Sequence, residues 1–203
     1  MTAKIAIITY STYGHINQLA DLVEEGVKSS GAIVTRFQLP ETLSEEVLSK
    51  MHAPPKNSYT VLKDPQDLKE FDGFLFGFPT RYGRAPAQVS SFFDTTGGLW
   101  MTGALVGKFA GIFTSTAGQH GGHETTALTT LPFLAHHGII YVPIGYANPN
   151  LNDNTELLGG APWGASTIAG GDGSRKPNSK ELDIAKFQGQ EFGKILNRYV
   201  AGK

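Results

Sequence analysis

Four short apolar runs constrain the fold of this chain more than any other feature of its sequence. They lie at residues 5–10, 73–78, 109–114 and 139–144, and none of them alternates polar with apolar residues. Continuous apolarity over roughly six residues is typical of a strand that is covered on both faces, as strands of parallel sheets are. A weaker run at residues 32–37 contains polar residues and predicts a fifth strand at an edge of the sheet.

Helical patterns separate these runs. Apolar residues follow three- and four-residue spacing between Ile16 and Val27, and again between Leu182 and Tyr199. Strands that alternate with helices predict repeated βαβ units, whose crossovers are right-handed. We therefore expect the α/β class, with a doubly wound five-stranded parallel sheet in the order 2-1-3-4-5 and helices on both faces.

Two segments do not fit the five-strand plan. Residues 40–67 form an excursion after the second strand, and residues 145–177 are long and rich in glycine. Loops longer than about 12–15 residues in a compact domain usually have a function or a partner. We predict a single domain over residues 1–203, with insertions at about 40–67 and 145–177.

Composition excludes several functional classes. The 17 basic and 18 acidic residues give a net charge of -1, so we expect no nucleic-acid partner. The chain has no cysteine, which excludes disulfides, thiolate metal sites and catalytic thiols. No apolar run approaches the roughly 20 residues of a membrane span, and no signal peptide is expected. We predict a cytoplasmic protein, with peripheral membrane association left open.

Ligands of a doubly wound sheet bind beyond the carboxyl ends of its strands, where the winding reverses. The first loop at this edge runs directly into a helix and contains Ser11, Thr12, Tyr13, Gly14, His15 and Ile16. Hydroxyls and backbone N–H groups at a helix N-terminus suit a phosphate. The loop lacks the lysine of a triphosphate-binding loop, which favours a monophosphate held without magnesium. An ordinary Ser/Thr helix cap is the alternative.

Two further loops end at the same edge. The second offers a rigid proline, a hydroxyl, a guanidinium and an aromatic ring, which together suit a flat heterocycle: Pro79, Thr80, Arg81, Tyr82 and Gly83. The third is small and glycine-rich, so its backbone amides can face a ring or a ribityl chain: Ser115, Thr116, Ala117, Gly118, Gln119 and His120. Either could be a plain turn, but their joint occurrence predicts one ligand site.

Five stretches carry a family resemblance. They are STYGHI at 11–16, PTRYG at 79–83, FFDTTGGLW at 92–100, LAHHGIIYVPIGY at 134–146 and GASTIAGGDGSR at 164–175. Along nearly its whole length the chain resembles the flavodoxin-like NAD(P)H:quinone oxidoreductases of the WrbA type. The resemblance implies a flavodoxin-like fold and a homotetramer.

The same resemblance implies the ligands. FMN is expected to contact residues 11–16, 80–82 and 115–120 together with His136, the nicotinamide to contact Tyr13, and a quinone to contact Trp100. The residues alone leave a core role open for Trp100 and a helix-terminal role for His136. The third loop departs from the family pattern at Ala117 and at the pair His120 and His123.

The expected activity is two-electron reduction of quinones by NADH or NADPH. The resemblance implies ping-pong hydride transfer through flavin N5, which protects against one-electron redox cycling of quinones. We predict no catalytic side chain, because the redox chemistry belongs to the cofactor. A flavodoxin-type electron carrier and a non-catalytic FMN-binding interaction protein are the alternatives.

Two groups of side chains suggest further ligands. His123 and Glu124 lie close to His120, but a glycine-rich turn fixes no coordination geometry, so we predict no metal site. Arg175 and Lys176 could meet the 2′-phosphate of NADPH, although nothing in the sequence positions them there.

Overall fold

The central strands of the sheet come from the most apolar runs of the chain. The structure is a computed structural model and describes residues 1–202. Strands β1 (Lys4–Thr9), β4 (Gly73–Pro79) and β5 (Phe109–Thr116) lie side by side, with β2 (Ile33–Gln38) and the short β3 (Thr60–Val61) beyond β1. β6 (Ile140–Tyr141) and β7 (Ser166–Ile168) both pair with β5, and all these pairs are parallel.

The α/β class and the doubly wound parallel sheet are confirmed. The order β2-β1-β4-β5-β6 reproduces the predicted 2-1-3-4-5, but the sheet has seven strands rather than five. β3 and β7 were missed because they are only two and three residues long. The sequence of β7, Ser-Thr-Ile, is also too polar to form an apolar run.

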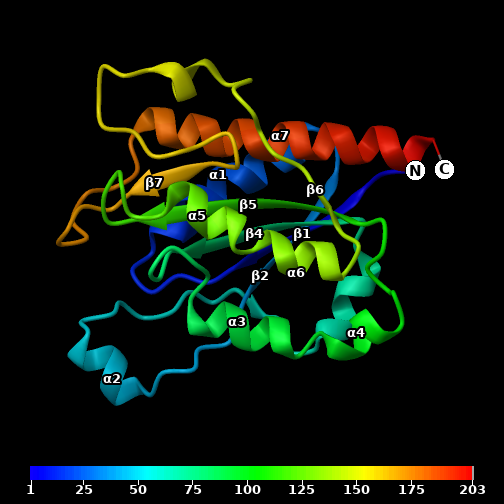
Figure 1. Cartoon of the computed structure of the whole chain (residues 1–203), viewed down its shortest axis with the longest axis horizontal. Helices are drawn as coiled ribbons and strands as arrows, with labels where there is room; N and C mark the ends of the chain where they lie inside the picture. The colour runs from blue at the N-terminus through cyan, green and yellow to red at the C-terminus, as the bar shows by residue number, and fades with distance from the viewer. Residues whose placement is uncertain (203) are drawn as a thin grey trace.

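Helices cover both faces of the sheet (Figure 1). α1 (His15–Ser29) and α7 (Ser179–Ala201) pack on one face. The other face is covered by four short helices: α3 (Ala87–Asp94), α4 (Gly97–Met101), α5 (His123–Leu128) and α6 (Leu131–His136). The remaining helical segments are α2 (Glu45–Lys50), η1 (Pro65–Glu70) and η2 (Pro149–Asn152).

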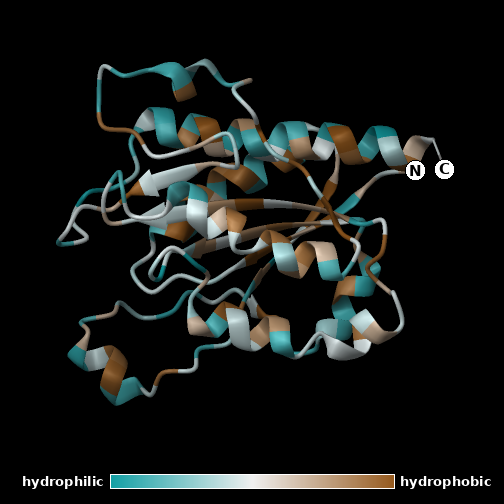
Figure 2. Ribbon diagram, viewed as in Figure 1, coloured by the Kyte–Doolittle hydropathy of each residue, from teal (hydrophilic) through white to brown (hydrophobic). Residues whose placement is uncertain are grey.

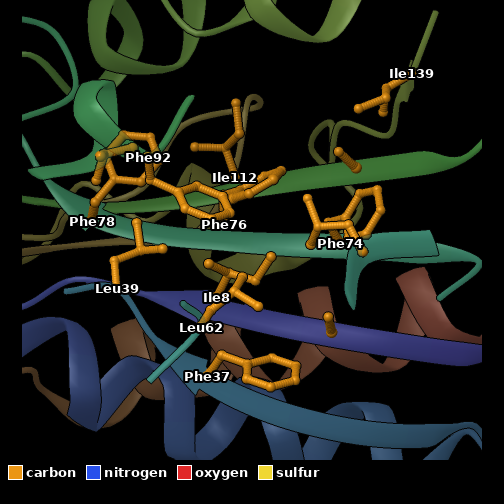
Figure 3. Close-up of a cluster of buried hydrophobic side chains, with 14 of the residues drawn as sticks. Ile8, Phe37, Leu39, Leu62, Phe74, Phe76, Phe78, Phe92, Ile112 and Ile139 are labelled. Atoms are coloured by element: carbon orange, nitrogen blue, oxygen red, sulfur yellow. The ribbon is translucent and has the colours of Figure 1, made fainter. Parts of the chain in front are cut away.

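Two hydrophobic clusters lie on opposite faces of the sheet. Ile8, Phe76 and Ile112 point into the cluster under α3 and α6, part of which is drawn in Figure 3. Ile7 and Phe113 point into the cluster under α1 and α7. Successive strand residues alternate between the two faces, so a strand buried on both must be apolar throughout.

Hydropathy along the helices follows the same division. Figure 2 shows α7 with hydrophobic and hydrophilic residues interleaved, as expected of a helix with one buried side. α2 stands apart at the tip of the 40–67 insertion and has no buried residue. No helix within residues 1–202 has both the length and the apolar composition needed to cross a membrane.

Glycines allow α1 and α7 to approach closely. A Cβ atom added at Gly26 would lie 2.0 Å from the carbonyl oxygen of Lys186, and one added at Gly189 would lie 2.1 Å from that of Val23. Both obstacles are backbone atoms, which cannot move without shifting a helix.

We expect Gly26→Ala to lower the free energy of unfolding by about 1–3 kcal/mol, because overpacking outweighs the better helix propensity of alanine. Denaturant titration measures this change. Gly97→Ala is the matched control, since a Cβ at that position meets nothing within 4 Å. Equal stability of the two variants would contradict the close approach.

Candidate active site

A cavity of about 370 Å³ lies at the carboxyl ends of β1, β4, β5 and β7. This volume falls within the roughly 300–1,000 Å³ of small-molecule sites. All three predicted loops line it, and a fourth joins them after β7. The lining residues are Ser11, Thr12, Tyr13, His15, Pro79, Thr80, Arg81, Ser115, Thr116, Ala117, Ala169, Gly170, Gly171, Asp172 and Gly173.

The N-terminus of α1 opens at the first loop. Gly14 precedes the helix in a left-handed conformation, with φ at 89°, and no side chain caps the helix. The Ser11 hydroxyl instead accepts a hydrogen bond of 3.0 Å from the Gly14 N–H. The first turn of α1 contains no acidic residue, whereas α7 begins with a capping box of Asn178 and Glu181. An uncapped helix N-terminus with no acidic residue in its first turn fits an anionic group such as a phosphate.

Arg81 connects the second loop to the first. Its Nη2 donates to the Thr12 hydroxyl at 3.2 Å, and its Nη1 donates to the Thr80 carbonyl at 3.0 Å. The Thr80 hydroxyl accepts from the Gly83 N–H at 3.1 Å and from the Thr126 hydroxyl at 2.8 Å. The guanidinium is therefore fixed at the cavity wall, where it supplies positive charge.

Tyr82 lies at the tip of the second loop. Tyr82 and Gly83 have φ angles of 54° and 78°, and they form a tight turn between Arg81 and Arg84. The Tyr82 side chain is fully exposed and does not line the cavity. Left-handed backbone at a bulky residue is strained and occurs mostly where surrounding structure imposes it.

His123 fixes the third loop from outside the cavity. Its Nε2 lies 3.0 Å from the Thr116 hydroxyl, and its Nδ1 lies 2.6 Å from the Ser166 hydroxyl. Thr116 donates its proton to the Gly118 carbonyl, so His123 Nε2–H must donate to Thr116 and Ser166 must donate to Nδ1. Burial lowers the pKa of His123 and favours this neutral form, against an opposing contribution from Glu181. The departure from the family pattern at this position therefore joins β5 to β7.

The fourth loop, residues 169–173, was missed by sequence reasoning. Arg175 holds its base: Nη1 donates to the Ile168 carbonyl at 2.6 Å and pairs with the fully buried Glu181 at 2.9 Å. The Arg175 carbonyl lies 2.9 Å from Nε2 of His15 in the first loop. The suggestion that Arg175 meets a 2′-phosphate is therefore wrong in this structure, because its guanidinium is bound to Glu181. The glycine cluster at 170–173 was the available signal for this loop.

Several predicted site residues do not line the 370 Å³ cavity. Ile16 is buried in the core, and Gln119 and His120 line a separate space of about 500 Å³ beside His123. Gly14, Gly83 and Gly118 belong to the three loops but, like Tyr82, do not line the 370 Å³ cavity.

Trp100 and His136 lie farther away. Trp100 belongs to α4 and His136 ends α6, both toward the opposite end of the sheet from the cavity loops (Figure 1). The Trp100 side chain is 56% exposed, and His136 is also exposed. Within a single chain, neither residue reaches the cavity.

The arrangement of these loops on a doubly wound sheet agrees with comparisons to known proteins. A family model described as NADPH-dependent FMN reductase matches residues 3–152. The chain belongs to this family. An NAD(P)H quinone oxidoreductase of Candida albicans is 54% identical over 201 residues, covering 98% of this chain and 70% of the relative. A quinone oxidoreductase of Triphysaria versicolor is 51% identical and covers 98% of this chain and 97% of the relative.

Solved structures support the fold of this FMN reductase family member. A WrbA-like flavodoxin from Agrobacterium tumefaciens aligns with a TM-score of 0.67 at 19% identity, covering 97% of this chain and 99% of that one. An archaeal flavodoxin aligns with a TM-score of 0.59 at 16% identity, covering 95% and 98%. The flavodoxin-like fold and the resemblance to WrbA-type quinone oxidoreductases are confirmed.

The partly buried His123 predicts a pH dependence of stability. Because its folded-state pKa is lower than its unfolded value near 6.5, the unfolded chain binds more protons as the pH falls below about 6.5. Stability is therefore lost on acidification. We expect His123→Asn to reduce the drop in unfolding free energy between pH 7.5 and 5.5, as measured by denaturant titration at both pH values.

His120→Asn is the control, since His120 is exposed in the loop that precedes α5. It should keep the wild-type drop. If the unfolding free energy of the His123 variant falls as much as that of the wild type, protonation of His123 is not coupled to unfolding.

Proposed function

We propose that this protein reduces quinones with NADH or NADPH, using FMN bound in the 370 Å³ cavity. The family match and the names of the relatives support the activity. The observation that carries the proposal is the uncapped N-terminus of α1, whose first residue, His15, lines a cavity built from four loops. When bound in this cavity, FMN would supply the redox chemistry that links oxidation of the nicotinamide to two-electron reduction of the quinone.

The side chains around the cavity bind and orient rather than react. Backbone amides at the start of α1 hold the phosphate, together with the hydroxyls of the first loop. Arg81 places positive charge at the cavity wall, where it would stabilise the negative charge of a reduced flavin. The glycines at 170, 171 and 173 let the fourth loop approach the ligand closely.

Tyr13 marks the open side of the cavity. Its ring is 44% exposed, and its hydroxyl donates to the Met51 carbonyl at 3.2 Å. We place the nicotinamide against this ring and the quinone on the same side afterwards. Because one side serves both substrates, the kinetics are ping-pong. In the cell we assign the protein to the cytoplasm, where paired electron delivery protects against one-electron redox cycling of quinones.

The function is tested by loading the purified protein with FMN and recording its visible spectrum. NAD(P)H is expected to bleach the flavin band and benzoquinone to restore it, with parallel double-reciprocal plots at steady state. Ser11→Glu should abolish FMN binding, because the new carboxylate competes with the phosphate for the α1 amides.

Ser49→Glu adds the same charge on the exposed helix α2 and should keep full FMN content. Absence of FMN binding by the wild type would reject the function. Intersecting double-reciprocal plots would contradict the proposal that both substrates bind on the same side of the cavity. Full FMN content in the Ser11 variant would show that the first loop does not bind the phosphate.

We further propose that copies of the chain assemble, as the resemblance to tetrameric WrbA-type enzymes implies. Trp100 and His136 can reach a cavity only on another copy. Trp100, Met101 and Val106 are 56%, 79% and 66% exposed, and they lie close together in the chain on and after α4. Exposed apolar patches of this kind mark interaction surfaces.

If Trp100 stacks on the quinone bound to another copy, Trp100→Ala should raise the quinone KM by about tenfold with FMN content unchanged. Steady-state kinetics with several quinones measures this, and sedimentation gives the mass of the assembly. Val47→Ala, which truncates an exposed apolar side chain on α2, should change neither. Unaltered quinone kinetics in the Trp100 variant would assign that ring to another role.

A further inference from the structure

The first loop, which we propose binds the phosphate, separates two cavities. Ser11 and Thr12 line the 370 Å³ cavity in front and a second cavity of about 320 Å³ behind. The rear cavity is bounded by the ends of β1 and β2, the first turns of α1, and residues 54–57 of the 40–67 insertion. Since open space lies on both sides, close packing alone does not hold the loop in place.

A mostly buried carboxylate organises the space beside the rear cavity. The Glu41 side chain is 16% exposed and pairs with the Lys56 ammonium at 2.7 Å. Its oxygens also accept hydrogen bonds from the Tyr10 hydroxyl at 3.0 Å and from Gln88 Nε2 at 2.9 Å. The N–H groups of Thr42 and Leu43 complete its partners at 2.9 and 3.1 Å. Glu41 thereby joins the insertion to β1 and to α3.

Two contacts lead from this carboxylate to the phosphate-binding loop. Lys56 Nζ donates to the Ser11 carbonyl at 3.0 Å and lies 4.8 Å from the centre of the Tyr10 ring. The Thr12 hydroxyl donates to the Tyr10 hydroxyl at 3.3 Å, and Tyr10 donates in turn to Glu41. The loop is thus held at two successive residues, by its main chain at Ser11 and by a side chain at Thr12.

Peptide geometry gives the Lys56 contact a consequence on the other side of the loop. The chain has no cis peptide bond within residues 1–202, so the Ser11 carbonyl and the Thr12 N–H point in opposite directions. Lys56 draws the carbonyl toward the rear cavity. The Thr12 N–H is therefore directed toward the front cavity, where an amide donor is needed beside the N-terminus of α1.

We propose that Lys56, held in place by Glu41, is a positioning residue for the phosphate of FMN. It acts through the Ser11–Thr12 peptide and does not contact the ligand, because it lines only the rear cavity. The 40–67 insertion is then a support for the cofactor loop. This inference rests on the proposed function, since it assumes that the front cavity holds FMN.

The charge states needed for this role persist over a wide pH range. Burial favours the neutral form of Glu41, but the hydrogen bonds from Lys56, Leu43, Gln88 and Thr42 outweigh it and hold the pKa of Glu41 at about 2. Burial raises the pKa of Tyr10 to about 12, so its hydroxyl remains a donor to Glu41. The support therefore stays intact between about pH 5 and 8.

The experiment compares FMN with riboflavin, which lacks the phosphate, in fluorescence titrations of the apoprotein. We expect Lys56→Met to raise the Kd of FMN by about tenfold, as for the loss of one charge-assisted hydrogen bond, and to leave the Kd of riboflavin unchanged. Glu41→Gln should also weaken FMN binding. If Glu41 acted only through its charge, removing that negative charge would strengthen the binding of an anion. Weaker FMN binding in Glu41→Gln would therefore indicate that Glu41 acts by positioning Lys56.

Two controls complete the design. Lys56→Arg keeps a charged donor and should restore most of the FMN affinity. Lys50→Met removes a lysine of the same insertion that pairs with Glu46 on α2, and it should bind both flavins normally.

Equal loss of FMN and riboflavin affinity in the Lys56 and Glu41 variants would overturn the proposal and indicate general loosening of the site. Unchanged FMN affinity in Lys56→Met would overturn it as well. Failure of the wild type to bind either flavin would instead reject the proposed function.

Discussion

The candidate active site depends on the hydrogen bonding of strand β5 along both of its edges. All eight residues from Phe109 to Thr116 are buried, and β4 pairs with seven of them from Phe109 to Ser115. On the other edge, β6 pairs with the first two residues and β7 with the last three. Because β7 joins only at the carboxyl end of β5, it adds a fourth loop to the edge where three others already meet. One buried strand thereby fixes the position of the whole cavity rim.

Polar side chains then hold each loop to a neighbour. Arg81 joins the second loop to Thr12, His123 joins β5 to β7 through Thr116 and Ser166, and Arg175 joins the fourth loop to the buried Glu181. Glu41 and Lys56 support the first loop from behind. These contacts are made within the protein itself, and loops that are held in this way lose less conformational entropy when a ligand binds. The glycine-rich loops are therefore shaped by partners distant in sequence.

Local pattern was sufficient to predict the sheet order and the first three loops, because buried strands are continuously apolar and their carboxyl ends share one edge. It was insufficient for β7, which has only three residues, two of them polar, and which forms a strand by pairing with the carboxyl end of β5. The partners of Arg175 and Lys56 were also out of reach, since the sequence pattern does not show which acidic side chain a given basic residue contacts. The role of His136 came from the resemblance alone, and that of Trp100 from the resemblance together with the glycines that precede it. Neither source says which copy of the chain supplies these residues.

Hydrogen–deuterium exchange of the apoprotein with and without FMN tests most directly whether these four loops form the cofactor site. We predict that FMN slows exchange in peptides covering residues 10–16, 79–84, 114–122 and 165–175, with little change in α2 or α7. Protection absent from these four segments, or confined to a different part of the chain, would contradict the site.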